Sequence, residues 1–457
     1  MKISEYILRI PGLKQIISLL GIDKAIIYTN IGLLWTSISG FFSVIFIVKF
    51  LTISQQGYWY TFTSLGALTT FAELGFTTII TQFISHEYAH LEEKNGVLNG
   101  NKDRIDRTIS LIKFSFKFYL VIISIAFLIL STIGVIFLGE LTSDYQILLA
   151  WILYSFTGAL MLMVTLFGAV LKGFNKVEKV QKVITLAGIA SSVTMWIALF
   201  LGLGLWSLGF AGLVNILFCL LLYIHSSYDL FNQIAHKKVV GKYRWLKETI
   251  PLQWRYAVSW ISGYFIFQFM VPVAMFYAGA PTAGKLGLSL VMVRFVQSMA
   301  SSWGMTKVPQ LNIYVAQKTR KNLDELFKNI QWQSLMVYIL GSVGLIFTML
   351  IIFPIVNWEN RILPIEEIII LFIAEGINLI VFNWAFYLRA HKQEPYMRIS
   401  LLNATLVALG IWVSYYLFSS TFIALFSFLM VQLIMLIPAR RILVNKKKEY
   451  EKGEIGY

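Results

Sequence analysis

Long apolar stretches recur along nearly the whole chain and are separated by short polar segments. A helix that crosses the hydrocarbon core of a bilayer needs about 20 mostly apolar residues, because the core is about 30 Å thick and each helical residue rises 1.5 Å. The sequence contains twelve such stretches and therefore predicts an all-α membrane protein with twelve transmembrane helices. The stretches are residues 25–48, 57–84, 114–137, 145–171, 183–203, 205–224, 256–277, 283–306, 333–354, 365–388, 399–418 and 422–439.

Composition supports lipid as the solvent of this chain. Hydrophobic residues make up 58% of it and charged residues only 13%, whereas soluble domains carry about 25% charged residues. Water would meet too much apolar surface if the chain were soluble. The net charge of +15 would point to a nucleic-acid partner in a soluble protein, but here the placement of the charges matters more, and we expect no nucleic-acid partner.

Lysine and arginine gather on alternate connections between the apolar stretches. If the N-terminus is cytoplasmic, all but four of the 38 Lys and Arg residues lie in cytoplasmic segments. The exceptions are Lys49, Lys285 and Arg361 on the outer side and Arg294 within a span. Because positive residues favour the cytoplasmic side, the pattern predicts cytoplasmic N- and C-termini and an even number of spans.

The predicted spans fall into two groups of six. The longest cytoplasmic connection, residues 225–255, separates an N-lobe at 25–224 from a C-lobe at 256–445. A cytoplasmic interfacial segment at 1–24 precedes the lobes and a basic cytoplasmic tail at 446–457 follows them. The sequence ISGFF at 38–42 is echoed by ISGYF at 261–265. Because six is even, the repeats are parallel and related by a pseudo-two-fold axis along the membrane normal, an architecture in which two lobes rock around a substrate site.

Several motifs give the chain a family resemblance. The segment QGYWYTF at 56–62, followed by FAELGF at 71–76 and by Gln82-Phe83, resembles bacterial polysaccharide-exporter flippases. These belong to the multidrug/oligosaccharidyl-lipid/polysaccharide exporter superfamily, with the O-antigen flippases as type members. The likeness covers the whole chain in length, span count and lobe division. A lipid II flippase of the same superfamily is expected to have two further helices.

The resemblance implies a transporter, not an enzyme. It implies flipping of undecaprenyl-pyrophosphate-linked oligosaccharide repeat units, of O-antigen or a similar polysaccharide, from the cytoplasmic to the periplasmic leaflet by alternating access. The expected location is the bacterial cytoplasmic (inner) membrane, and no cofactor is expected. Membrane lipids are expected partners, and a polysaccharide polymerase and a chain-length regulator are possible ones. The alternative within the superfamily is a multidrug or cation antiporter.

One motif suggests a different class of protein. The sequence HEYAH at 86–90 matches the H-E-x-x-H pattern, in which two histidines bind zinc and the glutamate acts as general base. A membrane zinc protease using His86, Glu87 and His90 is therefore a remote alternative. We prefer a polar extension of the second span, because no third ligand has a recognisable motif and charged residues follow directly, so we expect no metal.

Three charged residues lie within predicted spans: Arg294, Glu73 and Glu375. A charge at the centre of a bilayer costs about 2.5–3.5 kcal/mol on insertion scales, so it faces a wet cavity or a partner. The planar fork of Arg294 suits a pyrophosphate or an acidic sugar. The alternative is an ion pair between lobes with Glu73 or Glu375. Each of these acids is a candidate for ion coupling or for such pairing.

Four further residues are candidates for the transport machinery. Lys49 and Lys117 lie within about a turn of span ends, where they either extend to the lipid headgroups or line a cationic cavity mouth that binds substrate. Gly263 and Pro272 indicate a bend in the seventh span that a rocking helix could use as a hinge.

Overall fold

The computed structural model describes residues 24–73, 75–94, 96–239, 243, 245, 261–391 and 395–452. The predicted interfacial segment lies outside these residues except for Lys24, and so does most of the second half of the predicted 225–255 connection. The chain forms two compact units. Unit 1 comprises Met1–Leu51 and Leu68–Ala257, and unit 2 comprises Thr52–Ala67 and Val258–Tyr457. This division places Thr52–Ala67, which contains the start of the second predicted span, in unit 2, and the predicted 225–255 connection in unit 1.

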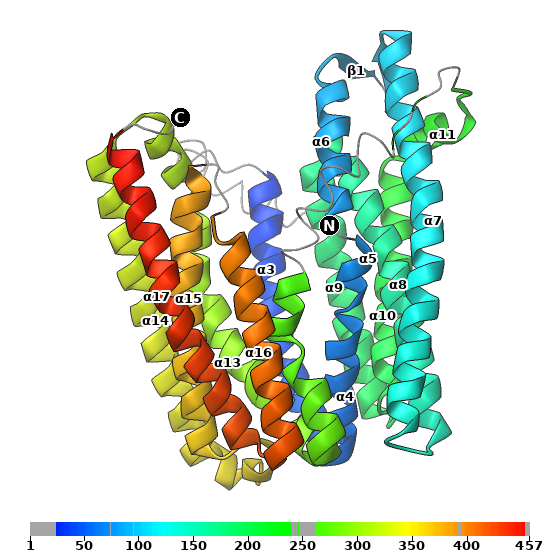
Figure 1. The fold of residues 1–457 in the computed structure, drawn as a ribbon. Coiled ribbons are helices and arrows are strands. Elements are labelled where there is room, and N and C mark those ends of the chain that lie inside the picture. Colours follow the sequence, from blue (N-terminus) through cyan, green and yellow to red (C-terminus); the bar gives the residue numbers. More distant parts are fainter. Residues whose placement is uncertain are drawn as a thin grey trace, which may run out of the picture. The chain divides into compact units, whose positions relative to one another are not determined.

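Unit 1 is a bundle of helices built around α8 and α9 (Figure 1). Helix α8 packs against α6, α7 and α10, and α9 packs against α3 and α10. The fully buried Trp151 of α8 donates its indole N–H to the carbonyl of Leu130, at 3.2 Å, and lies against Gly134, where any side chain would collide with its ring. The helices are α3 (Lys24–Phe50), α5 (Thr69–Glu73), α6 (Phe76–Tyr88), α7 (Lys102–Gly139), α8 (Tyr145–Gly173), α9 (Val177–Phe200), α10 (Trp206–Ser226) and α11 (Tyr228–His236).

A small β-hairpin, which the sequence analysis did not predict, connects α6 with α7. Strands β1 (Leu91–Lys94) and β2 (Val97–Gly100) pair antiparallel. The amide of Gln233 on α11 accepts from the N–H of Leu98 at 2.8 Å and donates to its carbonyl at 2.9 Å, which fixes the hairpin to α11. We call this end of unit 1 its basic end, because basic residues gather at the start of α7 and the end of α11. They are Lys102, Arg104, Arg107, Lys113, Lys237 and Lys238.

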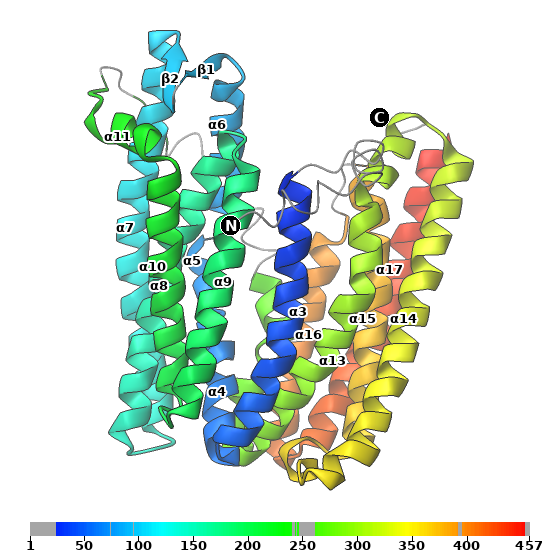
Figure 2. The ribbon, with the colours of Figure 1, turned by 180° about the vertical axis from the view of Figure 1, so that it is seen from behind.

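Unit 2 is organised around α13, which packs against α4, α14, α15 and α16 (Figure 2). Helix α15 also packs against α14 and α17 and is buried along much of its length. The helices are α4 (Ile53–Gly66), α13 (Met270–Ala316), α14 (Arg320–Ile355), α15 (Ile365–Ala390), α16 (Met397–Phe418) and α17 (Thr421–Lys452), with a short 3₁₀ helix η1 (Glu359–Arg361).

Helical structure lies at each of the twelve predicted spans, as far as they fall within the described residues. By length and apolarity, nine helices of the described part could cross a membrane, or ten if one bent pair counts as a span. The seventh and eighth predicted spans form one run, Ile261–Val315, in which Gly279 (φ 82°) interrupts α13. The tenth predicted span coincides with α15, which is not among these nine candidate membrane-spanning helices.

The second predicted span is not a continuous helix. It consists of α4, α5 and α6, with a bend of 41° between Ile53–Glu73 and Phe76–Tyr88. Gly75 precedes α6 with φ 75°, a left-handed conformation that glycine adopts without steric penalty. The span also passes from unit 2 to unit 1 between Ala67 and Leu68. Apolarity alone did not reveal these interruptions.

Helices α4 and α13 approach each other closely through glycine. A methyl group at Gly57 would lie 2.0 Å from the carbonyl oxygen of Ala280. Beside it, the buried Gln56 donates its amide to the carbonyls of Gly284, at 2.8 Å, and Arg361, at 3.1 Å. Small residues let helix backbones meet in membranes, so this contact joins α4 to the remainder of unit 2.

We expect Gly57→Ala to destabilise the protein by about 1–3 kcal/mol, because overpacking a close contact displaces backbone. Thermal unfolding in detergent measures the effect. The matched control is Gly40→Ala on α3, where an added methyl group meets nothing within 4 Å. Equal unfolding temperatures for the two variants would contradict the proposed role of the α4–α13 contact.

Candidate functional site

An ion pair inside unit 2 is the centre of the candidate site. Nε of Arg294 on α13 lies 2.8 Å from Oε1 of Glu375 on α15. The side chain of Glu375 is 0% exposed, whereas that of Arg294 is 23% exposed. The acid is therefore covered, and the accessible part of the pair belongs to the Arg294 side chain.

Two neighbouring polar side chains complete the environment of Glu375. Asn378, one turn later on α15, donates its amide to the second carboxylate oxygen at 2.9 Å. Gln297, one turn after Arg294 on α13, donates to the backbone carbonyl of Glu375 at 3.3 Å. Helix faces repeat at three to four residues, so two polar layers lie between α13 and α15. A buried charge is tolerated when it is paired and hydrogen-bonded in this way.

The predicted bend at Pro272 corresponds to a break in the helix. Residues 261–267 are helical, Gln268 and Phe269 form a turn, and α13 begins at Met270. Proline has no N–H, and its ring excludes the carbonyl four residues earlier, here that of Gln268. Gly263 lies within the preceding helical segment, where an added methyl group would meet nothing within 4 Å.

Side chains of α4 and of a later part of α13 bind the carbonyls at this break. Nη1 of Arg294 donates to the carbonyl of Phe267, and the hydroxyl of Ser64 on α4 donates to that of Gln268. The guanidinium also lies over the Phe267 ring, 5.5 Å from its centroid. Arg294 thus joins the broken helix to the buried acid on α15. No bond from its Nη2 to a described residue is seen.

The other predicted charges belong to unit 1, whereas Arg294 and Glu375 belong to unit 2. Glu73, on α5 of unit 1, accepts a hydrogen bond from the hydroxyl of Thr77. Lys49 is exposed at the end of α3, 5.6 Å from the Phe50 ring centroid. Lys117 is exposed on α7. The ion pair considered from sequence as a link between lobes lies instead within unit 2, and its acid is Glu375.

Three residues of the site, Asn378, Gln297 and Ser64, were not among the site residues predicted from the sequence. The first two carry a signal that could have found them, since each is a polar residue three positions after a charged residue in an apolar helix. Ser64 carries no such signal, because its role depends on where α4 crosses the break before Pro272.

In the HEYAH motif at 86–90, Glu87 forms ion pairs with two arginines of α7. Helix α6 ends at Tyr88, and His86 and His90 are exposed. Glu87 lies 3.4 Å from Arg104 and 3.3 Å from Arg107, so the residue that a protease would use as general base is held by two cations. Among the described residues, no group of three or more His, Cys, Asp or Glu side chains could hold a metal ion. The geometry gives the zinc-protease alternative no support.

Comparison with known proteins gives the fold. No protein-family profile matches the sequence, and no curated protein has a similar sequence. Among solved structures, an inward-facing multidrug resistance MATE family transporter of the MOP superfamily aligns with a TM-score of 0.66, at 10% identity, over 93% of this chain and 99% of its own. The lipid II flippase MurJ, in an inward closed conformation, aligns with a TM-score of 0.61, at 13% identity, over 90% of this chain and 86% of its own.

An outward-facing MATE family transporter of the MOP superfamily also aligns, with a TM-score of 0.55 and 12% identity, over 94% of this chain and 98% of its own. The predicted fold class, an all-α membrane protein of the exporter type, is confirmed by these likenesses. The chain is a multi-pass membrane protein with the fold of MATE transporters and MurJ.

We expect Arg294→Ala to destabilise the protein by about 3–5 kcal/mol, because it leaves Glu375 as an unpaired buried charge. The double variant Arg294→Ala, Glu375→Gln removes that charge and should recover most of the loss. Thermal unfolding in detergent is the measurement, and Arg398→Ala, at an exposed position on α16, is the control. A single variant as stable as the wild type would refute the structural role of the pair.

We expect the purified chain to hold no stoichiometric zinc, because no third His, Cys, Asp or Glu side chain among the described residues joins His86 and His90 in a group that could hold a metal ion. Elemental analysis of the wild type and of the double variant His86→Ala, His90→Ala checks this. One zinc per wild-type chain, absent from the variant, would overturn the interpretation of the motif.

Proposed function

We propose that this protein is a flippase that moves a lipid-linked, anionic oligosaccharide between the leaflets of a bacterial cytoplasmic membrane by alternating access. The exporter fold and the apolar helices support a membrane transporter. The MurJ likeness supports a lipid-linked substrate, since MurJ is described as a lipid II flippase. The family motifs at 56–62 and 71–76 support an undecaprenyl-pyrophosphate-linked repeat unit of O-antigen or a similar polysaccharide.

The proposal of an anionic substrate rests on the different exposures of the Arg294 and Glu375 side chains. The Glu375 side chain is 0% exposed and the Arg294 side chain is 23% exposed, so a solute that reaches the pair meets Arg294 and not the carboxylate. Arginine has five N–H donors, and the hydrogen bonds of Arg294 to described residues use Nε and Nη1. The remaining edge suits two oxygens of a phosphate or carboxylate.

Arg294 also supplies a route from ligand binding to helix movement. An anion at the guanidinium would compete with the carbonyl of Phe267 and with Glu375 for its donors. Weaker bonds to Phe267 would loosen the break before Pro272, and broken helices are elements that absorb conformational change. Gly263 and Pro272 therefore remain our proposed hinge.

Sequence patterns carry the remaining proposals. The distribution of Lys and Arg supports cytoplasmic termini, and the family resemblance supports substrate entry from the cytoplasmic leaflet. Lys49 is exposed at the end of α3 and is predicted to lie on the outer side of the membrane. We propose that it attracts the anionic head of the substrate there. The family resemblance also suggests a polysaccharide polymerase and a chain-length regulator as candidate partners.

A multidrug transporter is the second candidate function. The charges of Arg294 and Glu375 cancel, and a neutral site suits uncharged or amphipathic drugs better than an isolated arginine would. Two of the aligned structures are described as multidrug resistance transporters. In the flippase Arg294 would bind the anionic substrate, whereas in a multidrug transporter it would only neutralise Glu375. This difference can be tested.

We expect Arg294→Lys to lower surface polysaccharide about tenfold or more in a host that depends on this protein, because a charge-assisted hydrogen bond contributes about 1.5–3 kcal/mol. The decisive variant is Arg294→Ala, Glu375→Gln, which should be present in the membrane at the wild-type level and still be inactive. Surface polysaccharide and membrane protein are measured together, with Arg398→Lys as the control.

Restored polysaccharide in the double variant would show that Arg294 is structural, and the anionic-substrate proposal would fail. Loss of dye or drug efflux, with normal polysaccharide in all variants, would establish the multidrug alternative instead.

Glu73 is our proposed ion-coupling residue, and we expect Glu73→Gln to abolish the stimulation of transport by an imposed ion gradient. Glu375 is held by Arg294, whereas Glu73 accepts from the Thr77 hydroxyl and forms no ion pair with a described residue. Transport in membrane vesicles is measured with and without the gradient, with Glu140→Gln, at an exposed position just after α7, as the control. Equal stimulation in Glu73→Gln and the wild type would exclude Glu73 as the coupling residue.

A further inference from the structure

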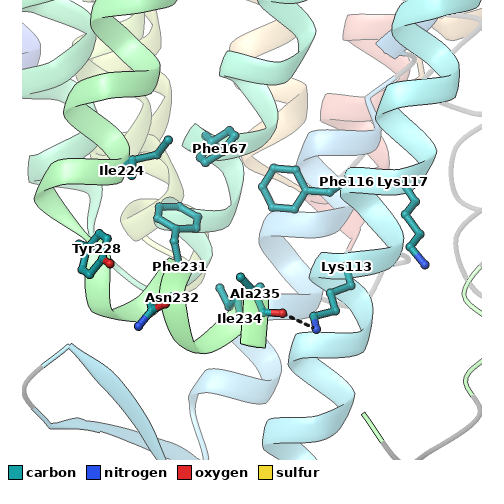
Figure 3. A pocket seen from close by; sticks show the side chains of 10 residues that line it. All are labelled: Lys113, Phe116, Lys117, Phe167, Ile224, Tyr228, Phe231, Asn232, Ile234 and Ala235. Carbon is teal, nitrogen blue, oxygen red and sulfur yellow. Dashed lines mark hydrogen bonds between the residues drawn. The ribbon is translucent and has the colours of Figure 1, made fainter. Parts of the chain in front are cut away.

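A pocket of about 500 Å³ opens at the basic end of unit 1, well removed along the sequence from the Arg294 site. Four helices contribute to it: α7, α8, α10 and α11 (Figure 3). Its walls are mainly aromatic and aliphatic, with the rings of Phe116, Phe167 and Phe231 turned toward one another. The ring centroids of Phe116 and Phe167 lie 4.8 Å apart, and those of Phe167 and Phe231 lie 5.0 Å apart.

The apolar surface extends beyond the pocket along the helices. Helix α8 packs against both α7 and α10, and these two expose large apolar side chains near the pocket, including Leu120 at 57% and Leu221 at 66% exposed. In a membrane protein such surfaces are covered by lipid chains. The pocket is thus the end of an apolar track that suits an acyl chain.

Helix α11 closes the pocket and has the character of an interfacial helix. Leu230 and Ile234, four residues apart, are buried, while Asn232 and His236, on the other face, are exposed. Short amphipathic helices of this kind lie at the boundary between headgroups and acyl chains. The pocket entrance is therefore expected at the depth of the lipid phosphates.

Two lysines give the entrance a positive charge. Lys113 donates to the carbonyls of Ala235, at 3.0 Å, and Lys237, at 2.8 Å, so one of the three donors of its ammonium group remains. Lys117, one turn later, is exposed and directs its ammonium away from the rings. Among the ion pairs of the described residues, none includes Lys117. None of the residues that line the pocket is acidic.

We propose that this pocket binds an anionic phospholipid of the surrounding bilayer. One acyl chain lies against Phe116, Phe167 and Phe231, and the phosphate binds between the ammonium groups of Lys113 and Lys117. The charge of the entrance selects an anionic over a zwitterionic headgroup, and the apolar track selects a lipid over free phosphate. The bound lipid holds α11 at the membrane surface and so stabilises the basic end of unit 1.

The test is native mass spectrometry of the full-length protein, purified in detergent and incubated with phosphatidylglycerol or phosphatidylethanolamine. We expect one phosphatidylglycerol to remain bound at collision energies that remove phosphatidylethanolamine. Lys117→Ala should weaken retention about fivefold, the effect of one lysine near an anionic membrane surface, and Lys117→Arg should restore it.

The matched control is Lys102→Ala, which removes the same charge from the same helix about 22 Å nearer its start, at 1.5 Å per residue. A second variant, Ile224→Trp, fills the pocket from an exposed position and should weaken retention of phosphatidylglycerol without changing a charge. Thermal unfolding without added lipid establishes that each variant is folded.

Three results would overturn the proposal. Equal retention of the two phospholipids would show that charge does not select the ligand. Equal loss in Lys102→Ala and Lys117→Ala would show general attraction to the basic end. Displacement of phosphatidylglycerol at a much lower concentration of undecaprenyl phosphate than of phosphatidylglycerol of another chain length would assign the pocket to the transported substrate.

Discussion

Every backbone N–H and C=O group within the hydrocarbon core must find a partner inside the protein, because lipid offers none. Continuous helices meet this requirement by themselves, but interrupted helices do not. In unit 2 the break before Pro272 exposes carbonyls that Ser64 and Arg294 bind. The position of a charged side chain deep in the bundle thus follows from a hydrogen-bond requirement of the backbone.

Once a guanidinium is placed there, its charge needs compensation. Glu375 supplies it from α15, and Asn378 and Gln297 bind the acid's remaining oxygen and its backbone carbonyl. Removing one partner from such a pair is far more damaging than replacing both. Arg294 therefore contacts both the carbonyl at the helix break and the buried Glu375. An anion that binds Arg294 would act on both contacts, and this connects the proposed anion binding with the proposed hinge.

The sequence predicts the helices well and their connections poorly. Lipid requires long apolar stretches, so helix positions can be located from hydropathy alone, and a helix lies at each predicted span within the described residues. The left-handed turn at Gly75 and the placement of Thr52–Ala67 in unit 2 depend on packing that apolarity does not encode. Arg294 is also recognisable from sequence as a buried charge. Its partner is not, because Glu73 and Glu375 are equivalent by span position, and only the fold brings α15 to α13.

The central claim is that Arg294, through the guanidinium donors that its bonds to Glu375 and Phe267 leave available, binds the anionic head of a lipid-linked substrate. The most direct measurement is the affinity of the purified protein for undecaprenyl pyrophosphate, compared between the wild type and the variant Arg294→Ala, Glu375→Gln. The account predicts that the variant unfolds at nearly the wild-type temperature but binds the lipid at least tenfold more weakly, about 1.4 kcal/mol. Equal affinity in the two proteins would contradict it and leave Arg294 with a structural role only.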